Sequence, residues 1–343
     1  MNRISTRHAG APLGVTAAPF IRDHPQTTLD LARVADGLGY HSFWVAEVNG
    51  PEAFSLLGAA SQTTRGVALG TGVLPLQVRT PPLLAMAAAS LQQLVPTREV
   101  LLGIGISSPV VASDWHGTEY GSRPLAQVRE FVTLLRACLS GEPVTFQGDF
   151  YDVRRFRLGV EMSDQRPKIV VGALGEGMLR LAGEVADGVL LNYIPASHVP
   201  WSVEQVRRGG NATIYANVHV GVGDRSLAER SARYDLFSYA VVDSYAQSFS
   251  RAGFADAVAA IRSAHQTGDR AAALAAVPDS MIDAINVVGD AALVDRTVQH
   301  YRDAGVDVPV IFPLTWGAEG LTAVAPTLAA AIGEERLVHA SAP

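Results

Sequence analysis

A strand, a glycine-rich turn and a helix follow one another at residues 168–186, and this order could bind a phosphate group. Residues 168–171 (KIVV) are typical of a parallel strand covered on both faces, and the small residues GALG follow at 172–175. Backbone N–H groups in the first turn of a helix lack helical partners, so Gly175, Glu176, Gly177 and Met178 could donate hydrogen bonds to an anion. The alternative is an ordinary connection in which glycine only permits the turn.

Three further side chains could contact a ligand or move a proton. Trp115 and His116 lie in a segment without periodicity, residues 107–123, and loops of that length in compact domains are often functional. An aromatic wall beside an imidazole suits a planar ligand. The alternative is a loop held down by its tryptophan. Glu47, at the end of a short apolar run, could act as an acid or a base, or cap the turn that follows.

Other catalytic signatures are missing or incomplete. The chain contains no H-E-x-x-H, no clustered cysteines and no Walker A sequence, so we predict neither a metal site nor a nucleotide hydrolase. The sequence GISSP at residues 105–109 falls short of G-x-S-x-G, which disfavours a serine nucleophile. The net charge of −6 argues against a nucleic-acid-binding surface.

Composition favours a globular cytoplasmic protein. Hydrophobic residues make up 48% of the chain and charged residues 17%, and no apolar run approaches the roughly eighteen residues that a membrane span needs. Residues 1–12 contain no apolar segment of the kind found in signal peptides. Cys138 is the single cysteine, so no internal disulfide can form.

Strand and helix patterns alternate along the chain and predict a single-domain (β/α)8 TIM barrel, to which 343 residues are well matched. The expected strands are 13–17, 41–46, 66–71 with a continuation to 75, 100–106, 168–171, 189–191, 213–222 and 308–314. A doubly wound sheet is the alternative, but the nearest match to G-x-G-x-x-G, residues 103–108, has serine in the third glycine position. In a barrel the strand ends converge at one mouth, and the residues there would be Glu47, Gly72, Ser107, Gly175, Asn192 and Leu314.

Three segments interrupt the alternation. We expect a loop insertion at about 107–123, a small hairpin at about 143–152 and a helical insertion at about 226–288 that covers one barrel end. The last full helix is expected at 291–304, before Gly305.

Several motifs in a fixed order resemble the bacterial luciferase-like monooxygenase superfamily, and more narrowly its coenzyme F420-dependent oxidoreductases. The motifs are FWVAE (43–47), LGTGVLP (69–75), LGIGISSP (102–109), WHG (115–117) and ALGEGMLRLAGEVADG (173–188). The resemblance extends from about residue 13 to about residue 314, and it implies a luciferase-like barrel with a deazaflavin across its mouth.

The resemblance also implies roles for particular residues. Gly72 and Val73 would be joined by a non-prolyl cis peptide that forms a bulge against the deazaflavin, with Ser107 beside it. The amides from Gly175 to Met178 would hold the cofactor phosphate. Three arginines, Arg79, Arg123 and Arg180, are candidates for an anionic cofactor tail. Sugar-phosphate dehydrogenases of this superfamily carry Asp-His where Glu47-Val48 stands and a glutamate where Ser107 stands, which argues against glucose 6-phosphate as the substrate.

On this basis we expect hydride transfer between F420 and a small organic molecule. Glu47 and His116 would contact the substrate or transfer a proton, Asn192 would position the substrate, and Trp115 would line its site. The helical insertion would form a lid or wall that excludes water. Two alternatives stay open: an FMN-dependent luciferase-like monooxygenase, and a non-catalytic flavin- or deazaflavin-binding protein. The family resemblance further implies a homodimer.

Overall fold

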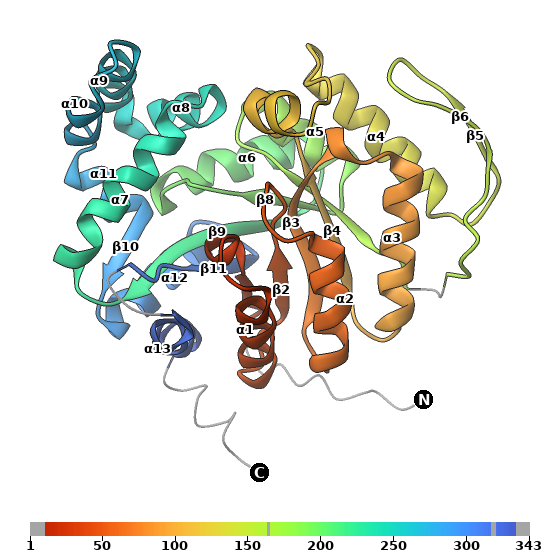
Figure 1. The fold of residues 1–343 in the computed structure, drawn as a ribbon, viewed down its shortest axis with the longest axis horizontal. Coiled ribbons are helices and arrows are strands. Elements are labelled where there is room, and N and C mark those ends of the chain that lie inside the picture. The colour runs from red at the N-terminus through yellow and green to blue at the C-terminus, as the bar shows by residue number, and fades with distance from the viewer. Residues whose placement is uncertain (1–10, 163–164, 317–319, 334–343) are drawn as a thin grey trace.

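Parallel strands close into a barrel at the centre of the structure, a computed structural model that describes residues 11–162, 165–316 and 320–333 (Figure 1). Within these residues the ring consists of eight strands, in the order β1 (Gly14–Thr16), β2 (Ser42–Val45), β3 (Ala68–Pro75), β4 (Val100–Gly105), β7 (Lys168–Gly172), β8 (Gly188–Leu191), β9 (Thr213–Val222) and β11 (Val308–Pro313). The parallel pairing of β8 with β9 closes the ring. The predicted TIM barrel is therefore confirmed. The prediction that residues 1–12 contain no signal peptide falls mostly outside the described residues.

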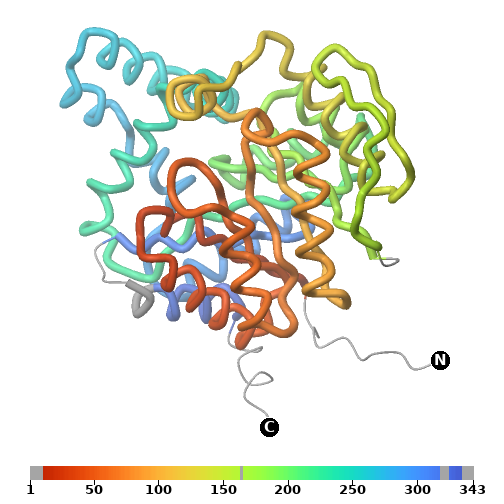
Figure 2. The backbone as a smooth tube through the Cα atoms, turned by 45° about the vertical axis from the view of Figure 1, so that its right-hand side comes forward, coloured from red at the N-terminus to blue at the C-terminus, as the bar shows by residue number. Residues whose placement is uncertain are grey.

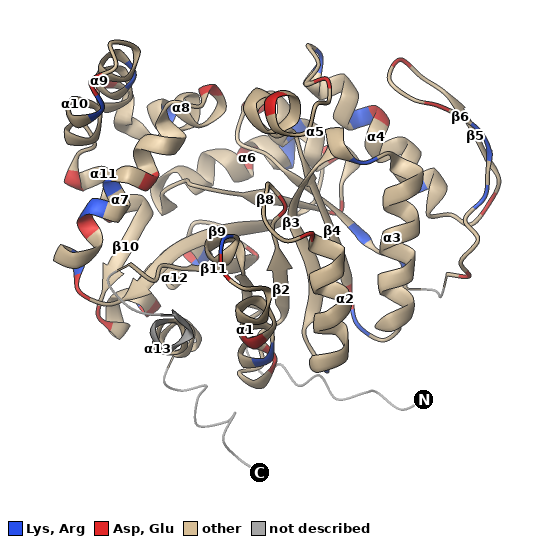
Figure 3. Cartoon of the chain, in the orientation of Figure 1, with Lys and Arg blue, Asp and Glu red and all other residues tan. Residues whose placement is uncertain are grey.

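Helices cover the outer face of the barrel because the strands carry apolar side chains on both faces. Every residue of β4 is buried, as a parallel strand between a filled barrel and a helical layer requires. The outer helices are α1 (Pro25–Gly37), α2 (Ala53–Thr63), α3 (Pro81–Leu94), α4 (Pro124–Cys138), α5 (Glu176–Val185), α6 (Val199–Gly209), α12 (Ala291–Asp303) and α13 (Gly320–Ile332). None of the described helices combines the length and apolarity needed to cross a membrane. Figure 3 shows the charged residues concentrated on helices and loops rather than on the barrel strands.

Two large aromatic side chains fill the middle of the barrel. Trp44 on β2 and Tyr215 on β9 meet edge to face with their ring centroids 5.2 Å apart, and Trp44 Nε1 donates to Ser42 Oγ over 2.8 Å. Glycine gives these rings their space: a Cβ on Gly70 would lie 2.8 Å from the indole, and one on Gly188 would lie 2.7 Å from the Tyr215 ring. The barrel is therefore a packed core and not a channel.

Aspartates hold the amino-terminal end of the barrel. Asp36, at the end of α1, accepts hydrogen bonds of 2.7 to 2.9 Å from three successive amides, those of residues 65–67 before β3. Asp187 accepts from the Ile169 amide over 2.7 Å, and Asp307 accepts from the Ile214 amide over 2.8 Å. These carboxylates fix the strand starts, so this end of the barrel serves stability.

Two excursions interrupt the alternation of strands and helices, a hairpin between α4 and β7 and a helical insertion between β9 and α12 (Figures 1 and 2). The hairpin consists of β5 (Val144–Gln147) and β6 (Asp152–Phe156), so it continues beyond the predicted residue 152. The helical insertion, named here the insertion, comprises α7 (Arg225–Ala240), α8 (Asp243–Phe249), α9 (Ala255–Gln266), α10 (Arg270–Ala275) and α11 (Asp279–Ile285).

The structure corrects three predictions of local structure. Residues Asn286–Gly289 form the strand β10, which pairs with β9, so the insertion does not continue to residue 288 as predicted. The helix at 291–304 is not the last one, because α13 follows β11. The segment 107–123 is not entirely irregular, since a short π-helix spans Val110–Trp115. In each case the element is short or depends on contacts with distant parts of the chain.

Candidate active site at the barrel mouth

The residues predicted to converge do lie at the carboxyl ends of neighbouring strands, here called the mouth. Glu47 follows β2, Val73 lies in the last half of β3, Ser107 follows β4, Gly175 follows β7 and Asn192 follows β8. All these strands are parallel, so their carboxyl ends point the same way. The structure therefore assembles residues far apart in the sequence around one opening.

The peptide bond between Gly72 and Val73 is cis, as the resemblance implied. The pairing of β3 with β4 shifts register between Thr71 and Leu74, so this segment forms a bulge, and Thr71 Oγ1 anchors it by donating to Gly103 O over 2.8 Å. Glycines flank Val73 on the adjoining strands: a Cβ on Gly105 would lie 3.0 Å from the Val73 side chain, and one on Gly172 would lie 3.5 Å away.

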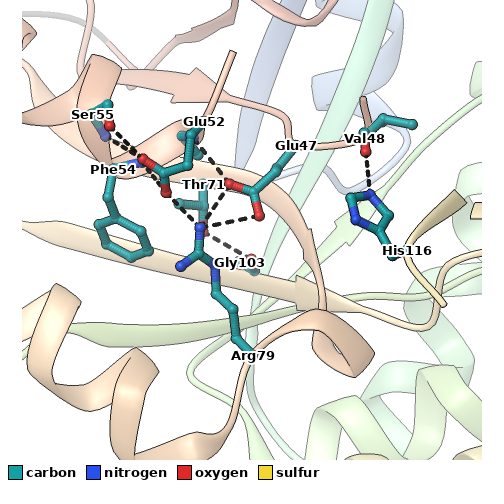
Figure 4. A network of polar contacts seen from close by, with 10 residues as sticks. Glu47, Val48, Glu52, Phe54, Ser55, Thr71, Arg79, Gly103 and His116 are labelled. Carbon is teal, nitrogen blue, oxygen red and sulfur yellow. Dashed lines mark hydrogen bonds and ion pairs between the residues drawn. The ribbon is translucent and has the colours of Figure 1, made fainter. Parts of the chain in front are cut away.

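Glu47 is held by several hydrogen bonds at the edge of this bulge (Figure 4). Its carboxylate accepts from the Ala53 amide over 3.0 Å and from Arg79 Nη2 over 2.9 Å. Arg79 also pairs with Glu52, which caps the start of α2. The Glu47 side chain is 12% exposed, so the mouth retains only a small accessible part of this carboxylate.

His116 and Trp115 occupy the loop that follows β4, and the two side chains differ in their contacts. His116 Nε2 lies 2.7 Å from Val48 O, so the imidazole ties this loop to the one after β2, as Figure 4 shows. Trp115 ends the π-helix and is 53% exposed. Beside this loop a cavity of about 570 Å³ opens between residues 76–80, residues 118–123 and the hairpin tip, and both Arg79 and Arg123 line it.

The first turn of α5 has the form predicted for an anion site. Gly175 is the N-cap residue, and no side chain caps the helix. Arg251 of the insertion donates to Leu174 O over 3.3 Å, which brings a cation next to this turn. Arg180, the third arginine predicted for the cofactor tail, forms an ion pair with Glu176 one turn earlier on α5.

Asn192 is the centre of a polar network inside the mouth. Its Oδ1 accepts from Asn217 Nδ2 and lies 3.1 Å from His219 Nε2, while its Nδ2 lies 3.3 Å from the Tyr245 hydroxyl. Burial lowers the pKa of His219 to about 3, so the ring is neutral and its Nε2–H donates to the carbonyl oxygen. This network aims the amide group of Asn192 at Tyr245.

A partly buried carboxylate of the insertion adjoins this network. Asp235 on α7 accepts from the Tyr193 hydroxyl over 2.9 Å and from Asn286 Nδ2 over 3.0 Å. Tyr193 directly follows Asn192 and has a φ of +50°, a left-handed conformation that is uncommon for an aromatic residue. Its ring centroid lies 4.1 Å from that of His219, so the two groups belong to one cluster.

Sequence reasoning missed most of this cluster, although one signal was present. Asn217 and His219 alternate with apolar residues in a strand that should be apolar on both faces, and period-two polarity inside such a strand indicates a functional inner face. Asp235 gave no such signal, because it lies on an insertion helix that carries many charged residues.

Comparison with known proteins places this geometry in a family. A sequence model described as luciferase-like monooxygenase matches residues 3–308. The chain belongs to the luciferase-like monooxygenase family. Among relatives of this luciferase-like protein, a putative coenzyme F420-dependent oxidoreductase of Mycobacterium tuberculosis is 28% identical, and the aligned region covers 88% of this chain and 95% of the relative.

Further comparisons agree with this assignment. A 5,10-methylenetetrahydromethanopterin reductase of Methanolobus tindarius is 28% identical over 80% of this luciferase-like chain and 86% of its own length. The solved structure of the coenzyme F420-dependent tetrahydromethanopterin reductase from Methanopyrus kandleri superposes with a TM-score of 0.79 over 96% of this chain and 99% of that chain, at 23% identity. The superposition confirms the barrel fold.

Proposed function

We propose that the protein is a coenzyme F420-dependent oxidoreductase that transfers hydride between the deazaflavin and a small organic molecule. The observation that carries the proposal is the first turn of α5, whose N-cap Gly175 supplies no side chain and which lies at the same barrel end as the bulge at Val73. A helix start of this kind suits a phosphate. The names of both relatives described above, one an F420-dependent oxidoreductase and one a reductase, support a redox role.

The residues at the mouth fit such a cofactor. Gly105 and Gly172 have no side chains, so the side chain of Val73 projects between their strands. This side chain would support the planar ring of the cofactor. The amides of residues 175–178 would hold the phosphate, and Ser107 would lie beside the ring. Arg79 and Arg123 line the neighbouring cavity and are candidates for an anionic tail. When bound, the deazaflavin would supply the hydride chemistry, and the protein would supply placement and proton transfer.

Glu47, His116, Trp115 and Asn192 would surround the substrate. The ion pair with Arg79 favours a positioning role for Glu47, because both carboxylate oxygens already accept hydrogen bonds. The exposed ring of Trp115 would form a wall, and the Asn192 amide would orient a polar group of the substrate. The variant His116→Ala tests the predicted catalytic role of the imidazole. If the variant retains every activity, His116 is not a catalytic residue.

A titration of the purified protein with F420 and, separately, with FMN tests the proposal. We expect micromolar binding of F420, followed by loss of deazaflavin absorbance with some member of a substrate panel. Binding of FMN in its place would favour the alternative of an FMN-dependent monooxygenase. Binding of F420 without reduction by any substrate would favour a non-catalytic carrier.

We also propose that the protein is a cytoplasmic homodimer that does not bind nucleic acid. Leu83, Met86 and Leu94 on α3 are each about half exposed and recur at helical spacing, which leaves an apolar stripe for a second copy. Light scattering at the mass of a monomer would contradict the dimer.

A further inference from the structure

Neighbouring tyrosine hydroxyl groups lead to the partly buried carboxylate of Asp235. The hydroxyl of Tyr193 donates to Asp235 Oδ1 over 2.9 Å, and the hydroxyl of Tyr239 interacts with that of Tyr193. The planes of the two tyrosine rings are tilted by 33° to each other, and the ring centroids lie 3.9 Å apart. Tyr193 is 1% exposed, whereas Tyr239 keeps partial contact with solvent. Asp235 and Tyr239, at the two ends of this chain of groups, are both partly exposed, and the buried Tyr193 lies between them.

We propose that Asp235, Tyr193 and Tyr239 form a proton relay that takes up or supplies the proton accompanying hydride transfer at the mouth. This inference rests on the proposed function. Tyr239 lies where a substrate would be held: the rings of Tyr239 and Tyr245 are 4.7 Å apart, and the hydroxyl of Tyr245 accepts from the Asn192 amide. Asn192 and Tyr245 also keep partial contact with solvent.

The surroundings of Asp235 make it able to exchange a proton near neutral pH. Burial raises its pKa to about 6, and the hydrogen bonds from Asn286 and Tyr193 limit the rise. The groups that face it are the hydroxyls of Tyr193, Tyr239 and Tyr245 and the amide of Asn286. The nearby Arg233 is directed away from it, towards Glu229 and Asp279. A general acid or base works best when its pKa lies near the working pH.

His219 is the other ionisable group of the cluster and a poorer candidate for this role. Burial lowers its pKa to about 3, so it stays neutral at any pH at which the enzyme would work. Its Nε2–H is already donated to Asn192. The imidazole therefore orients Asn192, and the proton must go elsewhere.

The network can hold Asp235 in both protonation states. When Asp235 is ionised it accepts from Tyr193 and Asn286, as observed. When it is protonated it can donate to Asn286, because the Oδ1 of Asn286 is buried without a hydrogen-bond partner in the described residues and the side-chain amide can rotate. Asn286 therefore offers Asp235 a partner in either protonation state: Nδ2 as a donor to the carboxylate, or Oδ1 as an acceptor from the carboxyl group.

The proton balance is simplest for the oxidation of an alcohol. The substrate carbon loses a hydrogen with its electron pair, and that hydride is taken by the deazaflavin of the proposed function. The hydroxyl on the same carbon loses its proton to the oxygen of Tyr239, and a carbonyl bond forms. Tyr239 passes its own proton to Tyr193, and Tyr193 passes its proton to Asp235. One hydride and one proton have then left the alcohol, and the reverse sequence serves reduction.

Infrared titration of the cofactor-free protein between about pH 4 and about pH 8 tests the relay without any activity. We expect a protonated carboxyl band that disappears with a midpoint near 6, is absent in Asp235→Asn and shifts in Tyr193→Phe. A midpoint at the ordinary aspartate value of about 4, unchanged in Tyr193→Phe, would overturn the proposal.

Kinetics with F420 and a substrate found in the panel provide the second test. Alcohol oxidation by the wild-type protein should rise with pH through about 6, because Asp235 must be ionised to accept the proton. Asp235→Asn and Tyr239→Phe should lower kcat about 100-fold and abolish this limb, with KM and cofactor affinity unchanged. A wild-type pH profile in either variant would refute the relay.

Two control variants separate the relay from general damage. Tyr234→Phe changes a half-exposed tyrosine on the same helix, and Tyr40→Phe removes a buried hydroxyl that donates to Leu328 O. Both should keep the wild-type pH profile, although Tyr40→Phe should be less stable. If Asp235→Asn does not fold, Tyr239→Phe retains the test. Failure to bind F420 would end the proposed function, and the infrared titration would still decide the relay.

Discussion

Arg79 Nη2 lies 2.9 Å from Glu47 Oε2, and this largely buried ion pair joins the end of β2 to the loop after β3. In Glu47→Gln the new amide would leave Arg79 without its more buried partner. We expect the free energy of unfolding to fall by about 1–3 kcal/mol, measured by urea denaturation. Glu52→Gln is the matched control and should cost less, because the Glu52 side chain is 43% exposed. A larger loss in the control would contradict this account.

The N-cap position of α5 allows the anion site to be blocked without damage to the fold. A Cβ on Gly175 meets nothing within 4 Å, and the φ of −90° suits any residue. In Gly175→Asp the new carboxylate would accept from the amides that we assign to the phosphate and would repel the phosphate itself. We expect F420 affinity to fall at least about 100-fold while the melting temperature stays equal or rises, because aspartate is a good N-cap.

Gly175→Ala is the control for this experiment, because alanine adds a methyl group but neither an acceptor nor a charge. Its affinity for F420, measured by fluorescence titration, should remain within about tenfold of that of the wild-type protein. Equal loss of affinity in the two variants would mean that the glycine backbone, and not the free amides, matters at this position.

Helices α5 and α6 cross so closely that glycine is required at the contact. A Cβ on Gly209 would lie 1.9 Å from Arg180 O, and one on Gly183 would lie 2.2 Å from Val206 O. Gly209→Ala must separate the helices, so we expect a loss of stability of at least about 2 kcal/mol together with weaker F420 binding, since α5 carries the proposed phosphate site. Calorimetry and cofactor titration measure the two effects.

Gly37→Ala provides the matched control for that substitution. Gly37 is the last residue of α1, and its Cβ would meet nothing within 4 Å. Alanine should therefore raise the melting temperature slightly, because it favours the helix by about 0.5–1 kcal/mol relative to glycine. Destabilisation by Gly37→Ala would show that the effect at Gly209 is not specific to the helix crossing.

Asp36 should make the stability of the barrel depend on acid pH. Burial alone would raise its pKa, but the hydrogen bonds from the amides of Gly66, Arg65 and Val67 and the charge of Arg98 outweigh burial, and the pKa is lowered. A carboxyl group whose pKa is lower in the folded state stabilises the fold above its unfolded pKa, and this contribution disappears as pH falls through the folded value. Urea midpoints should therefore drop more steeply below about pH 4 in the wild-type protein than in Asp36→Asn. Parallel pH curves for the two proteins would contradict the assignment.

The barrel and its mouth could be predicted because their signals are local. Each strand is a short apolar run, each is followed by a helix pattern, and the glycine turn before α5 marks its own function. The strand β10 escaped prediction because its few residues continue from α11 without a break in polarity, and only pairing with β9 makes them extended. The π-helix that ends at Trp115 likewise has no pattern by which sequence could reveal it.

The inner part of the candidate site could not be assembled from sequence for a different reason. Asp235 meets Tyr193 across 42 positions and Asn286 across 51, so no spacing rule connects them. Their encounter depends on how the insertion packs against the barrel, which is a property of the folded chain. Asn192 was predicted from its place after a strand, but its partners Asn217 and His219 required the barrel register.

The indole of Trp44 has a consequence for how this barrel can evolve. Its ring uses volume released by Gly14 and Gly70, where a methyl group would come within 3.1 Å and 2.8 Å of it. A smaller side chain at position 44 would leave a void, and a larger one at either glycine would collide with the ring. The side-chain volumes at positions 14, 44 and 70 are therefore coupled. Homologous barrels with a smaller side chain at position 44 should carry larger residues at positions 14 or 70.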